Sequence, residues 1–301
     1  MKIRLGLWAL ALFFVIMITA CGGGGSDAPR ATGLNPASVA VDPSGKFVYV
    51  ANWGSNDISA YTINVTTGAL TAGTAVAAGT NPYSVAIDPS GKFVYAANGG
   101  SNNISVYTIN TTTGALTAGT TVAAGTSPDS IAVDPSGKFA YAANWDSNNI
   151  SVYTINAATG ALTAGTAVTA WMNPAFVTVA PSGKFAYVAN WGSNNISVYS
   201  IDATTGALTA GTTVAAGTSP DSIMVDPSGK FAYAANWDSN DISVYTINTT
   251  TGALTAETAV AAGTSPASVA VDPSGKFAYV ANETDGTISV YTINPTTGTL
   301  Q

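Results

Sequence analysis

The sequence predicts an all-β protein, a β-propeller made of six repeats of a four-stranded blade. The segment DPSGKFVYVANW at Asp42–Trp53 is the first of six similar copies, which follow one another every 46 residues without insertions. A propeller blade of four strands needs about 40–50 residues. Turn signals rich in Gly, Pro, Asn and Asp separate short runs of β-branched and aromatic residues, and no segment has a helical period.

Each repeat contains four predicted strands, as the first copy shows. The first strand is Ser38–Asp42, the second is Lys46–Asn52 and the third is Ile58–Asn64. The second and third strands are apolar on both faces, which is expected of blades packed face to face around a ring. The fourth strand, Ala69–Val76, is weaker and more polar, so we expect it at the outer rim.

The N-terminus has the features of a bacterial lipoprotein signal. Two basic residues precede an apolar run at residues 5–20, which is too short to span a membrane. The run ends in ITAC, which resembles a lipobox. We therefore expect residues 1–20 to be a signal peptide, Cys21 to be lipidated and residues 22–25 to be a flexible tether. Gly22 after the cysteine resembles the outer-membrane sorting pattern of Gram-negative lipoproteins. We therefore expect the protein in the outer membrane, either on its periplasmic side or at the cell surface.

Residues 26–301 are expected to form a single propeller domain. Six periods of 46 residues make 276, which leaves 25 of the 301 residues. The last repeat stops where its fourth strand should begin, and Ser26–Gly33 occupies that place in register. We expect this segment to close the ring as an edge strand. The alternative is a seven-bladed propeller from which one blade is missing.

Composition excludes several classes of function. Without Lys2 and Arg4, seven basic residues face sixteen acidic ones, a net charge near −9. This charge argues against binding of nucleic acid and of anionic lipid. There is no histidine, and the single cysteine is the expected lipidation site. These absences exclude His-based triads and His-metal sites. We expect no cofactor and no metal site.

By analogy with other propellers, the turns divide between two ends of the ring. The Asp-Pro-Ser-Gly-Lys turns belong to one end. Their proline presets φ, their glycine takes the left-handed region and their aspartate caps the turn amides. Ala180 lacks this carboxylate in the fourth copy. The second-to-third turns and the connections between blades belong to the other end, where ligand sites of propellers usually lie.

Turns at this second end supply candidates for ligand contact. Four of them carry a tryptophan after an asparagine, and two continue with an aspartate, a composition suited to stacking and hydrogen bonding on a sugar or peptide. The alternative is that each tryptophan seals the rim between blades. Gly99 and Glu283 replace it in two copies. The candidate ligand-binding residues are Trp53, Trp145, Trp191, Trp237, Asn144, Asn236, Asp146 and Asp238.

The largest departure from the repeat is TAWMNPAF at residues 169–176. Trp171 and Met172 stand where other copies have Gly-Thr. If those glycines take positive φ, a tryptophan there would be strained and the loop should be reshaped. Two large apolar side chains in a surface loop suggest a contact patch for a ligand, and local packing is the alternative. Tyr83 is another large residue, at a strand entrance that is otherwise Ala or Asp.

Asp129 and Asp221 are the weak candidates for catalytic carboxylates. Each lies at the entrance of a first strand. The two belong to blades two positions apart, so the sequence does not tell whether they approach within the roughly 5–10 Å of paired carboxylate chemistry.

YVAN at Tyr49, Tyr187 and Tyr279, together with the DPSGK turns, resembles the YVTN-type and lactonase-like β-propellers of bacteria, over residues 34–301. The resemblance implies a propeller, usually of seven blades, and an activity like that of 6-phosphogluconolactonase. The His and Arg pocket expected of such an enzyme has no counterpart here. There is no histidine, and Arg30 is the one arginine after the signal peptide.

We therefore predict a lipid-anchored module of the cell envelope that binds or scaffolds a glycan, peptide or protein partner without catalysis. The alternative is a hydrolase of the lactonase-like family that acts on an uncharged lactone through aspartates in the central channel. A third possibility is a purely structural surface protein. The sequence does not define the oligomeric state.

Overall fold

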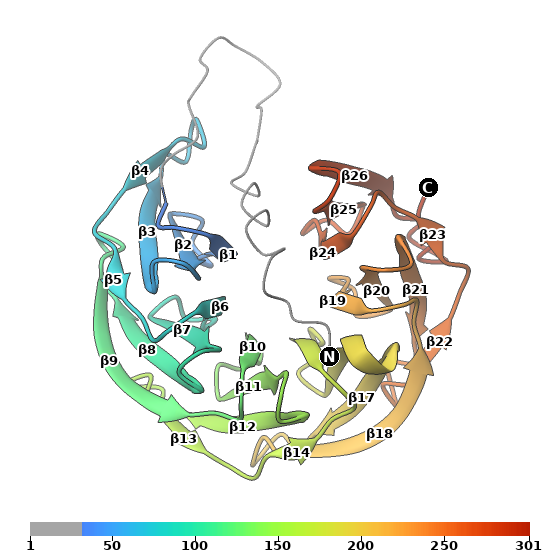
Figure 1. Ribbon diagram of the computed structural model, residues 1–301, viewed down its shortest axis with the longest axis horizontal. Helices are drawn as coiled ribbons and strands as arrows, with labels where there is room; N and C mark the ends of the chain where they lie inside the picture. The colour runs from blue at the N-terminus through green and yellow to red at the C-terminus, as the bar shows by residue number, and fades with distance from the viewer. Residues whose placement is uncertain (1–31) are drawn as a thin grey trace.

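The computed structural model describes residues 32–301, which form six antiparallel sheets around a central channel (Figure 1). In the first blade, β1 (Pro36–Val41) lies nearest the channel, followed outward by β2 (Phe47–Asn52) and β3 (Asp57–Ile63). At the rim, β4 (Leu70–Ala72) and β5 (Val76–Ala77) both pair with β3. The predicted propeller of six blades is confirmed.

The same strand order repeats in the next four blades, and the sixth blade has the first three strands without an outer one. The second and third blades consist of β6 (Pro82–Ile87), β7 (Phe93–Asn98), β8 (Asn103–Ile109), β9 (Leu116–Ala123), β10 (Pro128–Val133), β11 (Phe139–Asn144), β12 (Asn149–Ile155), β13 (Leu162–Ala164) and β14 (Val168–Thr169). The fourth, fifth and sixth consist of β15 (Pro174–Val179), β16 (Phe185–Asn190), β17 (Asn195–Ile201), β18 (Leu208–Ala215), β19 (Pro220–Val225), β20 (Phe231–Asn236), β21 (Asp241–Ile247), β22 (Leu254–Ala256), β23 (Val260–Ala261), β24 (Pro266–Val271), β25 (Phe277–Asn282) and β26 (Thr287–Thr292).

The outer strand is continuous in two blades and interrupted in three, and one residue accounts for the difference. The continuous strands β9 and β18 contain Thr121 and Thr213. The interrupted blades have alanine at the equivalent positions, Ala75, Ala167 and Ala259. A β-branched residue favours the extended conformation more than alanine does. The predicted weak fourth strand is therefore present in all five of these blades, with its continuity set by this position.

The N-terminal predictions fall outside the described residues. These are the signal peptide, the lipidated Cys21, the tether at residues 22–25 and most of the closing strand Ser26–Gly33. At the end of that segment, Thr32 and Gly33 are described and do not belong to a strand. Within residues 32–301, no helix has the length and apolar character needed to cross a bilayer.

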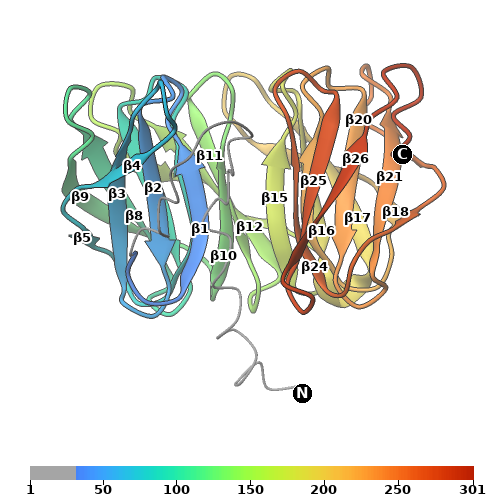
Figure 2. The ribbon, with the colours of Figure 1, turned by 90° about the horizontal axis from the view of Figure 1, so that it is seen from above.

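The strand register defines two faces of the propeller. Pro36 pairs with Asn52 at one end of the β1–β2 ladder, and Val41 pairs with Val48 at the other. We call the end with the β2–β3-type turns and the connections between blades the mouth face. The end with the Asp-Pro-Ser-Gly-Lys turns is the base face. Both sets of turns project beyond the strands in the side view (Figure 2).

The turns of the base face are capped by their aspartates, as predicted. One carboxylate oxygen of Asp42 accepts hydrogen bonds from the amides of Lys46 (2.7 Å) and Phe47 (2.6 Å), and the other accepts one from the Ser44 amide (3.0 Å). Burial alone would raise the pKa of the Asp42 carboxyl, but the hydrogen bonds from Ser44, Phe47 and Lys46 outweigh burial and lower the pKa. In the fourth blade, Ala180 has no carboxylate, and the Lys184 amide keeps the bond to the Ser182 hydroxyl (3.3 Å) that the third and fifth blades make in addition to their caps.

The hydrophobic core lies between neighbouring blades. Tyr187 and Ile196 of the fourth blade pack with Ile223 and Tyr245 of the fifth in one fully buried cluster. Every residue of the second strand is buried in the first five blades, which agrees with the prediction of strands apolar on both faces. In the sixth blade, β25 alternates between exposed and buried residues.

Among residues 32–301, the ring is open between the sixth and the first blade. The first strands pack side by side in the series β1, β6, β10, β15, β19, β24, and Figure 1 shows β24–β26 separated from β1–β3. The side chains agree, because Val39 and Val41 on one side and Tyr279 and Val290 on the other are exposed. The six blades therefore leave one interval of the ring unfilled, which is consistent with the predicted alternative of a seven-bladed propeller lacking a blade.

Candidate functional site

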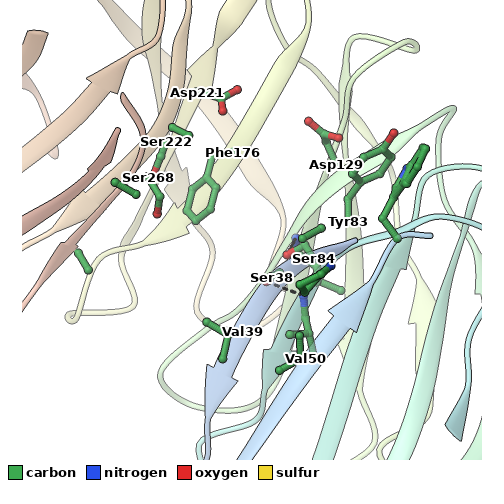
Figure 3. Close-up of a pocket in the computed structure, with 18 of the residues that line it drawn as sticks. Ser38, Val39, Val50, Tyr83, Ser84, Asp129, Phe176, Asp221, Ser222 and Ser268 are labelled. Carbon is green, nitrogen blue, oxygen red and sulfur yellow. Dashed lines mark hydrogen bonds between the residues drawn. The ribbon is translucent and has the colours of Figure 1, made fainter. Parts of the chain in front are cut away.

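A pocket of about 610 Å³ lies at the centre of the ring, toward the mouth face (Figure 3). The first strands of the blades supply most of its wall, which is largely apolar. Val39 and Val50 come from the first blade, Phe176 from the fourth and Met224 from the fifth. A concave, mostly apolar pocket with a few polar groups is the usual form of a small-molecule site.

One position in each first strand is aimed into this pocket by a β-bulge. The pairing of the first with the second strand skips one residue in every blade, between Pro128 and Ser130 in the third for example. The skipped residue falls outside the Cα register of the two strands, and a bulge of this kind commonly redirects a side chain beside an active site. The six skipped residues all line the pocket: Ala37, Tyr83, Asp129, Ala175, Asp221 and Ala267.

The structure brings the two predicted carboxylates into one pocket. Asp129 and Asp221 occupy the skipped positions of β10 and β19 and lie in facing walls, with Phe176 of the intervening blade between them (Figure 3). Among the described residues that line the pocket, they are the two charged side chains. The lysines follow the turns of the base face, at the opposite end of the strands. The described lining of the pocket therefore carries negative charge and no cation.

A tyrosine that the sequence singled out forms the wall beside Asp129. The ring of Tyr83 lies 6.2 Å from that of Trp53, centroid to centroid, with 44° between the planes. A Cβ at Gly99 would lie 2.5 Å from the ring of Tyr83. Tyr83 thus fills the space that the tryptophan of other copies would need, so these two departures from the repeat form one structural unit.

The serines after the skipped position connect the blades. The hydroxyl oxygen of Ser38 accepts a hydrogen bond from the amide of Val85 in the next blade, and Ser84 accepts one from Ile131, both at 3.2 Å. Phe176 replaces this serine in the fourth blade and faces the pocket. Sequence reasoning missed Phe176, although it could have been found, because the other five copies share a serine at this position.

The structure places only part of the predicted tryptophan platform at the pocket. Of the four turn tryptophans, Trp53 belongs to the pocket lining. Trp145 and Trp191 lie elsewhere on the mouth face, half-buried, with ring centroids 5.4 Å apart and planes at 48°. Trp237 is half-buried in the same way. The pairing of Trp145 with Trp191 supports the alternative that these rings seal the rim between blades.

The prediction that Asn144 and Asn236 contact a ligand is wrong, because both side chains are fully buried. The amide nitrogen of Asn144 donates to the side-chain oxygens of Asn149 (2.7 Å) and Ser151 (2.9 Å). Asn236 makes the equivalent bonds to Asp241 (2.7 Å) and Ser243 (2.9 Å). These asparagines hold the second and third strands together beneath the turn.

The same asparagines explain the glycines that Trp171 replaces. At Gly79, a Cβ would lie 2.7 Å from the side chain of Asn98. Its φ is not in the left-handed region, which is occupied two residues later by Asn81. The hypothesis of positive φ at these glycines is therefore wrong, and the need for glycine comes from close packing on the asparagine.

The loop that contains Trp171 and Met172 keeps the backbone of the other copies, so the expected reshaping is wrong. Asn173 has φ +52°, against +53° at Asn81, and its amide donates to the Asn148 side chain as the Asn81 amide donates to Asn56. The following turn forms a 3₁₀ helix, η2 (Trp191–Ser193), whose Ser193 hydroxyl accepts a hydrogen bond from the Met172 amide (2.9 Å). Trp171 and Met172 are 54% and 55% exposed, so local packing does not bury them. Neither residue lines the central pocket.

Asp146 and Asp238 are exposed on the mouth face. Each carboxylate accepts a hydrogen bond from a serine in the connection between blades, Ser127 for Asp146 and Ser219 for Asp238 (2.6 Å). They therefore hold the connection against the turn. No group of three or more His, Cys, Asp or Glu side chains that could hold a metal ion occurs within residues 32–301.

A family model described as "Lactonase, 7-bladed beta-propeller" matches residues 26–123, 85–178, 163–269 and 255–301. No curated protein matches the sequence.

Solved structures with the same fold include two Bacteroides proteins named as candidate 6-phosphogluconolactonases. The chain is 25% identical to the protein of Bacteroides uniformis, with a TM-score of 0.82. The match covers 90% of this chain and 85% of that one. The chain is 26% identical to the protein of Bacteroides fragilis, with a TM-score of 0.81, over 92% of this chain and 84% of that one. A periplasmic gluconolactonase of Pseudomonas aeruginosa, 20% identical over 91% of this chain and 86% of that one with a TM-score of 0.78, shares the fold.

Proposed function

Since the chain belongs to the seven-bladed lactonase propeller family, we propose that it hydrolyses an uncharged lactone in the central pocket. The observation that carries this proposal is the convergence of Asp129 and Asp221, each projected by a bulge, on one largely apolar pocket. This alternative is better supported than a purely non-catalytic module.

The chemistry needs one group that removes a proton and one pocket that holds the ring. A carboxylate of Asp129 or Asp221 takes a proton from water as the water oxygen attacks the lactone carbonyl carbon. The ring C–O bond then breaks, and the leaving oxygen takes a proton back, which gives the open hydroxy acid. The apolar wall formed by Phe176 and Met224 would bind the carbon skeleton of the substrate and exclude bulk water.

The charge of the pocket selects the class of lactone. A phosphorylated substrate would bring a dianion beside two carboxylates, with no lysine or arginine among the described lining residues to bind it. The two Bacteroides proteins are named for a phosphorylated substrate, and this pocket favours a neutral one. Asp129 and Asp221 can also accept hydrogen bonds from the hydroxyl groups of a sugar lactone.

A second candidate function is binding of a glycan, peptide or protein partner at the mouth face. It rests on Trp171 and Met172, two large apolar side chains that are more than half exposed. Anchoring of the protein in the outer membrane through Cys21 would suit either function, and it remains part of the proposal.

The test compares three variants of the full chain with a neutral δ-lactone as substrate. We expect Asp129→Asn and Asp221→Asn to reduce turnover, by about 10²–10⁴-fold for the residue that acts as the base. Asp146→Asn is the matched control, because Asp146 is an exposed carboxylate of the mouth face outside the pocket. Equal turnover in all three variants, or no turnover above background in the unmodified chain, would contradict the proposal and favour the binding function.

A further inference from the structure

The five closed interfaces between blades share one set of contacts. In each, a tyrosine of the second strand donates its hydroxyl to the carbonyl oxygen of a turn glycine in the next blade, as Tyr233 does to Gly298 (2.8 Å). The phenylalanine two residues before the tyrosine packs on the same glycine, as Phe231 does on Gly298. The other four pairs are Tyr49 with Gly114, Tyr95 with Gly160, Tyr141 with Gly206 and Tyr187 with Gly252.

The sixth blade presents the first half of this interface to solvent. Its Phe277 and Tyr279 are 38% and 40% exposed, and Val290 on the neighbouring strand is 58% exposed. The equivalent residues of the fifth blade, Phe231, Tyr233 and Val244, are all at most 5% exposed. The sixth blade thus carries the donor half of the shared contacts.

The first blade presents the second half. Gly68 is the equivalent of Gly114, with the same left-handed conformation (φ +74° against +73°). Phe47 packs on Gly114, whereas no heavy atom of the described chain outside its neighbours lies within 4 Å of a Cβ built at Gly68. Val39 is 44% exposed, and its equivalent in the second blade, Val85, is 6% exposed.

From these two half-interfaces we infer that the interval between the sixth and first blades binds one further blade of the same 46-residue repeat. Its Phe-x-Tyr strand would pack on Gly68 and donate to the Gly68 carbonyl. Its Thr-Thr-Gly turn would receive Phe277 and accept the hydroxyl of Tyr279. The contacts continue those already present at five interfaces, and the family match is to a seven-bladed fold.

A second copy of the chain suits this interval less well. The inner blades of a copy are already covered on both faces. A terminal blade could enter the interval only with its neighbour attached. A single blade has both faces available at once, so it matches the two exposed surfaces together.

The added blade would also complete the wall of the pocket. Val39 and Val50 of the first blade line the pocket on one side of the interval (Figure 3), and Tyr279 of the sixth blade lines it on the other. The pocket therefore opens into the interval, and an occupant would close it. The inference concerns assembly, and its readouts are independent of lactone turnover.

The test extends the chain by one repeat, with a second copy of residues 256–301 placed after Gln301. We expect the extended protein to be a monomer with a Tm at least about 5 °C higher, and with slower amide exchange at Val39 and in β25 than in the unextended chain. Val290→Asp should abolish the gain in Tm in the extended protein and leave the unextended chain nearly unchanged, because Val290 is exposed there. Val65→Asp is the matched control, since Val65 is 74% exposed and its equivalents at closed interfaces, such as Thr111 and Ala157, are exposed as well.

Three results would overturn the inference. One is an extended chain in which the added repeat stays unprotected from exchange. Another is a gain in Tm that persists in Val290→Asp. The third is a dimer of the unextended chain in which Val39 and β25 are already protected, which would identify a second copy as the occupant.

Discussion

The base face and the mouth face are made by the same six repeats, yet they differ in how faithfully the repeats are copied. On the base face, five of six copies keep the capping aspartate and all six keep the lysine after it. On the mouth face, the skipped position of the bulge is Ala, Tyr or Asp, and the turn residue is Trp, Gly or Glu. A contact that every blade needs is repeated, whereas a pocket at the centre of the ring needs different side chains from different blades. Variation among copies therefore marks the candidate site.

The largest effect on stability is expected at the base face, at a glycine that combines positive φ with close packing. Gly206 has φ +72°, and a Cβ there would overlap the ring of Phe139. Gly206→Ala should lower the free energy of unfolding by about 2–4 kcal/mol, from backbone strain and overpacking. Gly68→Ala has the same backbone strain without the overlap, so it should cost about 1 kcal/mol. Urea unfolding of both variants measures the difference, and equal losses would contradict the role of the Phe–Gly contact.

An intermediate effect is expected beneath the mouth face. Asn144→Ala removes a buried amide together with its hydrogen bonds to Asn149 and Ser151. We expect a loss of about 1–3 kcal/mol. Asp146→Ala, in the same turn but exposed, should change stability by no more than about 0.5 kcal/mol. If the two variants lose the same stability by thermal or urea unfolding, the asparagine is not the scaffold of this turn.

The smallest effect is a gain. Ala180→Asp would restore the cap that the fourth blade lacks, and it should add about 1 kcal/mol at neutral pH, by comparison with helix caps. Urea unfolding at neutral pH checks the sign, and a loss of stability would show that the fourth turn cannot accept the carboxylate.

The gain should depend on pH in a defined direction. Hydrogen bonds led by the one from the Ser274 hydroxyl lower the pKa of Asp272 to about 2, below its ordinary value of 3.8. A cap of this kind stabilises the fold above the unfolded pKa and loses that effect as the pH falls through the folded value. The advantage of Ala180→Asp should therefore be complete above about pH 4 and disappear toward pH 2. A gain that is constant from pH 7 to pH 2 would show that the carboxylate does not cap the turn.

The sequence predicts the fold well because the information is repeated. Six copies of one segment specify the strands, the turns and the capping role of Asp42, and each copy supports the others. Asp129 and Asp221 could be identified as departures from the repeat at a strand entrance. Their meeting in one pocket could not, because it depends on a bulge in strand pairing that leaves no mark in the residue types.

The wrong prediction for Asn144 also arises because strand pairing cannot be read from residue types. Asn144 and Trp145 are adjacent in the sequence, yet one is fully buried and the other half-buried. Composition alone assigns both to a binding surface, since asparagine and tryptophan suit stacking and hydrogen bonding equally well. The direction of each side chain follows from strand pairing across the blade, which sequence reasoning on single turns does not supply.

The central claim is that the pocket of Asp129 and Asp221 hydrolyses a neutral lactone. The most direct measurement compares kcat/KM of the full chain for glucono-δ-lactone with kcat/KM for the same lactone carrying a 6-phosphate. We predict a value at least about tenfold higher for the neutral substrate, because the phosphate would lie near two carboxylates without a cation among the described lining residues. An equal or higher value for the phosphorylated lactone would contradict the account.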